Sequence, residues 1–288
     1  MFNLLSGIER FGLEANVEDI TKETSKNDDA SADPSAPVVH KEEDFLFLKS
    51  FECPLCDKQF KSPVLKSGKS RRKEPDIDLR PRMEHIDPNK YDIVSCPQCG
   101  FTSMQRYFGH LLPAQRKWLR EDFCAKLPKP PATEATEIHT IDYDTAIDFF
   151  KLSLYATMVK KGHMSEKAYS CLKIAWLLRG KMEELAADDV DKNKTEILQC
   201  RSDYQSFYKQ AFEGFVKAMS SENYPMCGMD QNTVDLLIAG MAYNLGKYDY
   251  ASRFVSSLIL SRTAGQNVKK RARDLKEKII EKLNSQKM

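Results

Sequence analysis

The chain of 288 residues has no long hydrophobic run. A membrane-spanning helix needs about 20 consecutive, mostly apolar residues, whereas the most apolar stretches here, residues 234–245 and 254–260, are short and interrupted. Residues 1–10 also lack the charged start and long apolar core of a secretory signal. These absences exclude a membrane-spanning protein and make the cytoplasm the expected compartment.

The sequence also lacks the motifs that carry common catalytic and cofactor chemistry. It contains no phosphate-binding GxxxxGK[ST] loop, no GxGxxG after a strand, no HExxH and no GxSxG. We therefore expect no enzymatic activity.

Charge is nearly balanced over the chain, with 44 Lys and Arg against 42 Asp and Glu, but it is unevenly distributed. Residues 1–44 carry eleven acidic and four basic residues, and residues 16–44 have almost no large apolar side chains. Such a composition predicts a largely disordered acidic head. The short apolar motif of residues 2–13 is either a small docking helix or a terminus that packs on its own domain. The end is the reverse, since residues 262–287 carry nine basic and three acidic residues.

Eight cysteines are too few for a disulfide scaffold in a chain of this length, and their spacing is more informative. Four of them form two CxxC pairs, Cys53 with Cys56 and Cys96 with Cys99. The alternative of two independent redox pairs is weak, because a thioredoxin-type motif lies at a helix start in a βαβ unit. The other four are scattered through helix-like sequence: we expect Cys124, Cys171 and Cys200 to be packing residues and Cys227 to be more exposed.

Each CxxC pair resembles a zinc knuckle, in which two residues between the thiolates turn both sulfurs toward one point. Gly100, directly after the second pair, can adopt the positive φ that such a turn needs. Two knuckles make one closed tetrahedral site, so we expect one structural zinc ion and no catalysis there. His85 and His110 lie in or beside this region, but four cysteines already complete the shell. The 39 residues between Cys56 and Cys96 predict a strand hairpin with a projecting loop.

The hydrophobic pattern divides the chain into regions and predicts an α+β fold that is mostly α. Short alternating runs in residues 45–112 predict a small zinc-ribbon domain. Residues 113–141 predict a short helix opened by Pro113, followed by a Pro-rich linker. Residues 142–288 predict six helices in three pairs, with stops at Gly162, Gly180 and Gly246 and a cap at Ser165. Their spacing favours a tetratricopeptide-like array of helical hairpins over an ordinary bundle.

Two further sets of residues are candidates for contacts with a partner. Trp176 and Arg179 combine an aromatic ring and a guanidinium group on one helix, which can anchor a peptide, although core packing is the commoner role of a Trp. Arg71, Arg72 and Lys73 form a basic run suited to phosphate contacts. Because acidic residues follow at once and no aromatic residue is interleaved, a solvated hairpin tip is the simpler interpretation.

Several separated motifs resemble one known family, the bacterial Domain of Unknown Function 2225 (DUF2225). The resemblance covers about residues 45–283. It rests on CPLCDKQFKSPVLKSGKSR, DIDLRP, IDPNKYDIVSCPQCGF, LKIAWLLR and LIAGMAYNLGKYDYASRFVSSLI. It implies a bacterial cytosolic protein with an N-terminal zinc ribbon, whose ligands are Cys53, Cys56, Cys96 and Cys99, and a repeat-like helical part. It implies no activity.

Taken together, these features predict a non-enzymatic adaptor that binds a protein or peptide partner through its ribbon and helical surface. The alternative is a nucleic-acid or ribonucleoprotein binder that uses the basic run at 71–73 and the basic last helix. A membrane partner is not expected.

Overall fold

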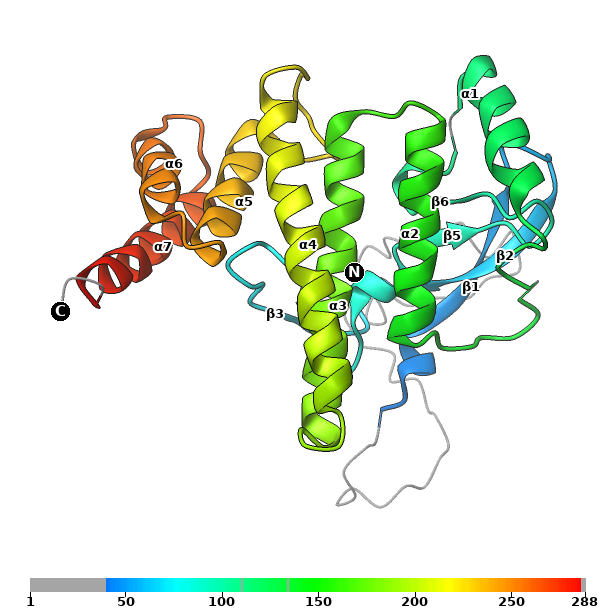
Figure 1. Cartoon of the computed structure of the whole chain (residues 1–288), viewed down its shortest axis with the longest axis horizontal. Helices are drawn as coiled ribbons and strands as arrows, with labels where there is room; N and C mark the ends of the chain where they lie inside the picture. Colours follow the sequence, from blue (N-terminus) through cyan, green and yellow to red (C-terminus); the bar gives the residue numbers. More distant parts are fainter. Residues whose placement is uncertain (1–39, 110, 134, 286–288) are drawn as a thin grey trace, which may run out of the picture. The chain divides into compact units, whose positions relative to one another are not determined.

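The computed structural model describes residues 40–109, 111–133 and 135–285, which belong to one compact unit. Most of the predicted acidic head, with its apolar motif, and His110 lie outside the described residues. The described part is mostly helical, with small sheets toward its N-terminal side, which confirms the predicted α+β class (Figure 1).

The strands form three separate antiparallel hairpins. In the first, β1 and β2 pair in a register that opposes Leu46 to Leu65 and Glu52 to Gln59. The strand bounds are β1 Leu46–Glu52, β2 Gln59–Leu65, β3 Arg72–Lys73, β4 Arg82–Met83, β5 Ile93–Ser95 and β6 Thr102–Met104. Short 3₁₀ turns accompany them at η3 Glu42–Phe45, η4 Pro88–Tyr91 and η5 Gln105–Tyr107.

The first and third hairpins, together called the ribbon here, each close on a CxxC pair. Cys53 and Cys56 lie in the turn between β1 and β2, and Cys96 and Cys99 lie in the turn between β5 and β6. The β3–β4 hairpin is the insert between the two halves of the ribbon. Each of these hairpins therefore presents its two cysteines in the turn at one end.

The predicted short helix covers the ribbon rather than leading straight into a linker. Pro113 occupies the first helical position, as predicted. The helical run continues with changing pitch, and buried Leu119 and Phe123 pack on the ribbon's aromatic residues. Its parts are α1 Pro113–Trp118, the π-helical turn η6 Leu119–Phe123 and the 3₁₀ turn η7 Cys124–Lys126.

Six helices follow in residues 143–285, the predicted number. Consecutive helices pack on each other, α2 on α3, α3 on α4, α5 on α6 and α6 on α7, while α2 also contacts β5 and β6 of the ribbon (Figure 1). Their bounds are α2 Tyr143–Val159, α3 Met164–Asp188, α4 Lys194–Met219, α5 Gln231–Asn244, α6 Tyr248–Leu260 and α7 Gln266–Ser285. None of the helices in the described ranges is long and apolar enough to cross a membrane.

The three glycines that the sequence predicts as helix ends have different roles in the structure. Gly246 adopts a φ of 72° between α5 and α6, as predicted. The predicted stop at Gly180 is wrong, because α3 continues to Asp188: a Cβ at Gly180 would lie 2.6 Å from Tyr143, so glycine lets α2 approach α3. At the end of α2 the left-handed residue is Lys161, with a φ of 55°, and not Gly162.

The predicted cap of α3 is also corrected. Ser165 lies inside the helix, whose N-cap is His163. The carboxylate of Glu222 accepts hydrogen bonds from the backbone N–H groups of Met164, at 2.6 Å, and Ser165, at 3.1 Å. A side chain distant in sequence thus satisfies the free N–H groups that a local cap normally takes.

Candidate functional site

The two CxxC turns have the same backbone geometry. In the first, Asp57 N–H donates to the carbonyl of Cys53 at 2.9 Å, and in the second, Gly100 N–H donates to the carbonyl of Cys96 at 3.0 Å. Both closing residues are left-handed, with a φ of 58° at Asp57 and 76° at Gly100. The positive φ predicted at Gly100 is confirmed, and Asp57 fills the equivalent place in the first turn.

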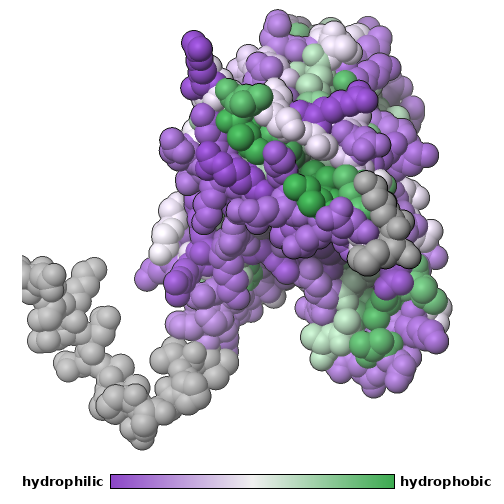
Figure 2. Space-filling model, turned by 90° about the vertical axis from the view of Figure 1, so that its left-hand side faces the viewer, coloured by the Kyte–Doolittle hydropathy of each residue, from purple (hydrophilic) through white to green (hydrophobic). Residues whose placement is uncertain are grey.

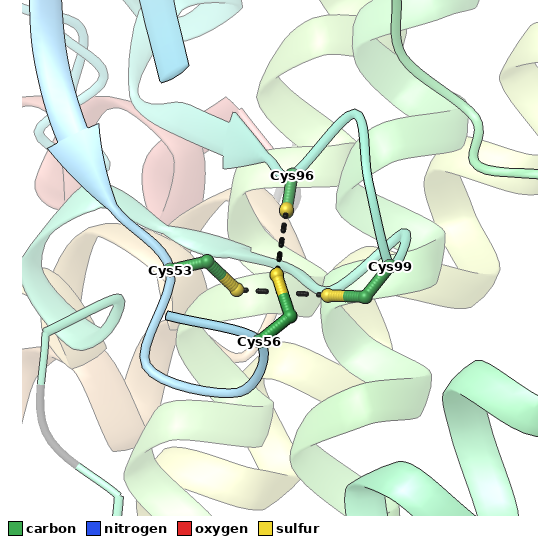
Figure 3. A group of neighbouring side chains, drawn as sticks. All are labelled: Cys53, Cys56, Cys96 and Cys99. Carbon is green, nitrogen blue, oxygen red and sulfur yellow. Dashed lines mark hydrogen bonds between the residues drawn. The ribbon is translucent and has the colours of Figure 1, made fainter. Parts of the chain in front are cut away.

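These turns direct four sulfur atoms toward one point (Figure 3). The Sγ atoms of Cys53, Cys56, Cys96 and Cys99 all lie within 4.8 Å of one another. Cys53 lies 3.5 Å from Cys99, and Cys56 lies 3.7 Å from Cys96. A tetrahedron with metal–sulfur distances of about 2.3 Å has edges of about 3.8 Å. The four cysteines therefore fit a metal ion, and four thiolates leave no open position for a substrate.

The thiols of this cluster share protons unevenly because they are so close. Hydrogen bonds from Cys53 and Cys99 lower the pKa of Cys96 to about 2. The hydrogen bond to Cys96, together with burial, raises the pKa of Cys53 to about 12. Backbone N–H groups in each turn also point at the first sulfur of that turn and favour its thiolate. A bound cation favours the thiolate form of all four ligands, so metal binding releases protons.

The segment after α1 covers the second cysteine turn. The side chain of Leu127 packs on Gly100, where an added Cβ would lie 2.6 Å from the Leu127 Cδ1 atom. Cys124 is half-buried and packs against the same hydrophobic cluster, with its thiol close to that of Cys99. Arg120 donates to the carbonyl of Leu55 in the first turn, at 3.1 Å from Nε. Both turns are thus contacted by residues of the predicted short helix and of the linker that follows it.

Among the other cysteines, the predictions for Cys171 and Cys200 are confirmed, since both are buried. The prediction for Cys227 is wrong. It is only 6% exposed, because its loop packs against the helical core. Its thiol donates to the carbonyl of Ser165 at 3.3 Å. His85 is not part of the four-cysteine cluster. Its ring stacks on that of Phe45, with ring centroids 5.8 Å apart.

A second buried polar site, which the sequence did not predict, joins the insert hairpin to the helices. The turn between β3 and β4 places Asp78 at 0% exposure. Its carboxylate accepts hydrogen bonds from Trp176 Nε1 at 3.1 Å, from Tyr208 Oη at 2.9 Å and from both terminal nitrogens of Arg179. This set is called the Asp78 cluster below. The hairpin turn therefore does not project into solvent, as the expected loop would.

The Asp78 cluster decides between the two interpretations of Trp176. Its indole is 3% exposed and lies in the core, so the core-packing interpretation replaces the one in which Trp176 anchors a partner. Arg179 is partly exposed but pairs with Asp76 at 3.1 Å as well as with Asp78. Burial opposes the charge of Arg179, but the nearby Asp78 carboxylate outweighs this effect, so the pKa of Arg179 is raised. The two residues do bind a peptide segment, and that segment is the chain's own hairpin turn.

Close backbone contact and further ion pairs reinforce this junction. An added Cβ at Gly240 in α5 would lie 2.2 Å from the carbonyl oxygen of Ile77, so only glycine admits the turn. Arg80 is buried and pairs with Glu183 of α3 at 2.9 Å and with Asp87 at 3.4 Å. No residue pattern in the sequence signals the contacts of Ile77 with Gly240 and of Arg80 with Glu183, because these partners lie more than 100 positions apart.

The basic run of the insert hairpin remains in solvent. Arg71, Arg72 and Lys73 are exposed, and none of them forms an ion pair within the described part of the chain. The next residue, Glu74, reaches α7, where its carboxylate lies 4.0 Å from Arg271. The structure thus brings the basic run next to the basic last helix.

An open cleft of about 590 Å³ lies between the hairpin turn and alternate helices. Arg179 of α3, Leu236 and Asn244 of α5, and Leu275 and Lys278 of α7 line it opposite the turn. This cleft is called the inner groove below. Its size falls within the range of about 300–1,000 Å³ that is typical of ligand sites.

Comparison with known sequences decides the family. The profile of DUF2225, described as uncharacterized proteins conserved in bacteria, matches residues 46–279. The chain belongs to the DUF2225 family. The match covers the ribbon, the insert hairpin and nearly all of the helices. No curated protein and no solved structure matches the chain significantly.

Proposed function

We propose that this DUF2225 protein is a non-enzymatic interaction protein that binds a segment of a protein partner in its inner groove. A structural zinc ion on Cys53, Cys56, Cys96 and Cys99 holds the ribbon, and the insert hairpin between the two halves of the ribbon forms one wall of the groove. The protein is expected to act in the cytoplasm.

The choice of zinc is supported by the ligands. Sites of four cysteine thiolates with short CxxC spacing are typical of structural zinc, which takes a closed tetrahedral shell. The same chemistry argues against catalysis at this centre, since a substrate would have to displace a ligand.

The helical part supports binding of a peptide-like partner. The groove is lined by α3, α5 and α7, every second helix, as in arrays of helical hairpins whose inner helices form the binding face. This arrangement supports the tetratricopeptide-like interpretation.

The main support for the proposal is that a segment of the chain itself already covers part of this helical face. Residues Ile77–Leu79 already lie against α3, α4 and α5, with buried hydrogen bonds to Asp78. The inner helices therefore already hold a short segment of the chain, folded as a tight turn in which Leu79 N–H donates to the carbonyl of Asp76 at 2.9 Å. The inner groove continues the same surface toward α7.

Affinity capture with matched variants tests the proposal. The tagged full-length protein is compared with R271E/K278E, in which two groove residues are reversed in charge, and with R273E/K276E. In the control pair, Arg273 and Lys276 lie on the same helix, are exposed and do not line the groove. Bound proteins are identified by mass spectrometry.

We expect the groove variant to lose partners that the wild type and the control variant retain. Zinc content, at one ion per chain, and melting temperature should be equal in all three proteins. Recovery of every partner by R271E/K278E would contradict the groove as the binding site, and turnover of a substrate by the purified protein would contradict the non-enzymatic assignment.

A further inference from the structure

We infer that the inner groove recognises a short protein segment in which acidic and aliphatic residues alternate. This inference rests on the proposed function and names the chemistry of its partner. Two independent observations point to it: the segment that the inner helices already hold, and five cations beside the groove, four of which have no ion pair in the described part of the chain.

The first observation is the chain's own hairpin turn, Asp76-Ile77-Asp78-Leu79. The two acids bind polar groups of α3 and α4, since Asp76 pairs with Arg179 and Asp78 accepts from Trp176 and Tyr208. The two aliphatic side chains pack against the core formed by the helices. The segment that packs on the inner face in this structure is therefore one in which acidic and aliphatic residues alternate.

The second observation is the charge at the open end of the groove. Arg71, Arg72 and Lys73 precede the hairpin wall, and Arg271 and Lys278 line the α7 wall. We call these five residues the cationic rim. In the described part of the chain, only Arg271 has an ion pair, and that pair is a 4.0 Å contact with the exposed Glu74.

The acidic residues near the groove do not cancel this rim. Asp76 is already paired with Arg179 at 3.1 Å and Arg82 at 3.3 Å, so Glu74 and Asp274 are the carboxylates left to face five cations. Because residues 1–39 hold eight acidic and three basic residues, residues 40–288 carry 41 basic and 34 acidic residues. An acidic partner is thus attracted both by the rim and by the net charge of this part.

The lining of the groove favours a protein segment over a nucleic acid. Its floor includes Ile77, Leu79, Leu236 and Leu275, which suit aliphatic side chains rather than phosphates. No aromatic side chain lines this cleft in the described structure, so it offers no platform on which unpaired bases could stack. In the hairpin turn the aliphatic side chains pack on the helical core while the carboxylates meet cationic and polar groups, and we expect the partner segment to divide its side chains between the floor and the rim in the same way.

Fluorescence anisotropy with three labelled probes tests the inference on the metal-loaded, full-length protein. The first probe is an eight-residue peptide with two repeats of Asp-Ile-Asp-Leu, the sequence of residues 76–79. The second replaces each Asp by Lys, and the third is a 20-base-pair DNA duplex. Each probe is titrated with the wild type, with R271E/K278E and with R273E/K276E, at low and at high salt.

We expect the acidic peptide to bind at least about tenfold more tightly than the basic peptide, and to weaken as salt rises. R271E/K278E should lose about tenfold or more of this affinity, whereas R273E/K276E should stay within about twofold of the wild type. Equal melting temperatures of the variants exclude misfolding as the cause.

The other outcomes overturn the inference and separate it from the proposed function. If both peptides bind equally and R271E/K278E weakens both, the groove binds peptides but does not select acids, so only the inference fails. If the duplex binds through the same residues and the acidic peptide does not, the partner is a nucleic acid. If no probe binds, the alternation is wrong, and affinity capture still judges the groove.

Discussion

Two buried polar sites join distant parts of this chain, and they differ in how they are built. At the four-cysteine cluster, two short turns of the same geometry each supply two sulfurs. At the Asp78 cluster, one carboxylate meets donors from two helices that are about 100 and 130 residues away. The first site is a repeated local motif, whereas the second exists only because the whole structure converges on it.

The two sites also join different parts of the molecule. The four-cysteine cluster joins the two halves of the ribbon, and the Asp78 cluster joins the insert hairpin to the helices. The insert hairpin supplies one wall of the inner groove. The face that carries α6 and α7 is mostly hydrophilic with separated hydrophobic spots, which agrees with a partner held by charge as well as by apolar contact (Figure 2).

Removing one sulfur should give the largest effect. C96S leaves three thiolates, so we expect loss of the metal ion and of the ribbon's folded structure. Structural zinc contributes on the order of 10 kcal/mol to folding in zinc-finger peptides. Elemental analysis and hydrogen exchange of residues 46–104 measure both losses, with C171S as the control. A metal-free C96S protein with a protected ribbon would contradict the structural role of the metal.

Breaking the Asp78 cluster should come second. D78A leaves the buried donors of Trp176 and Tyr208 without their shared acceptor and leaves Arg179 with Asp76 as its remaining carboxylate partner. Removing one partner of a buried pair costs about 3–5 kcal/mol. The matched control is E74A, because Glu74 is exposed at the edge of the same turn. Chemical denaturation measures both. Equal stability of D78A and E74A would show that the insert hairpin does not depend on this site.

Adding a methyl group at Gly240 should lower the stability less, although it acts at the same junction. In G240A the new methyl group meets the backbone of Ile77, which has to shift, and overpacking of this kind costs about 1–3 kcal/mol. G265A is the control, since no heavy atom lies within 4 Å of a Cβ built there. Metal content should not change in either variant. Loss of the metal from G240A would mean that the two sites are not separate.

The smallest effect concerns thiol reactivity. Burial raises the pKa of Cys171 and of Cys227 from an ordinary 9.0 to about 11, so the reactive thiolate is about a hundredfold scarcer at neutral pH. We expect alkylation of both to lag far behind that of a free thiol such as N-acetylcysteine, as read by peptide mass spectrometry. Rapid modification of Cys227 would contradict its buried position.

The contrast between the two sites also shows what sequence can predict. The CxxC spacing identified all four cysteines that cluster, because the ligands of each turn are neighbours in the chain. Gly100 and Pro113 were assigned correctly for the same reason, since their roles follow from local backbone geometry.

The errors arose where distant contacts decide the structure. Gly180 signals a helix end in sequence, but in the fold it makes room for Tyr143. Asp78 follows a basic run and looks like part of a solvated turn, yet it is the centre of a buried network. The loop of Cys227 was expected to be exposed because Pro and Gly surround it, and the helices cover it instead.

Photo-crosslinking at α7 tests the central claim, binding in the inner groove, most directly. A photoreactive amino acid replaces Lys278 in the groove or, in a second protein, Lys276 on the outside of the same helix. The structure predicts a crosslinked partner at position 278 that is absent at 276, and the crosslinked peptide should be acidic. Crosslinks at 276 alone, or equally at both positions, would contradict binding in the inner groove.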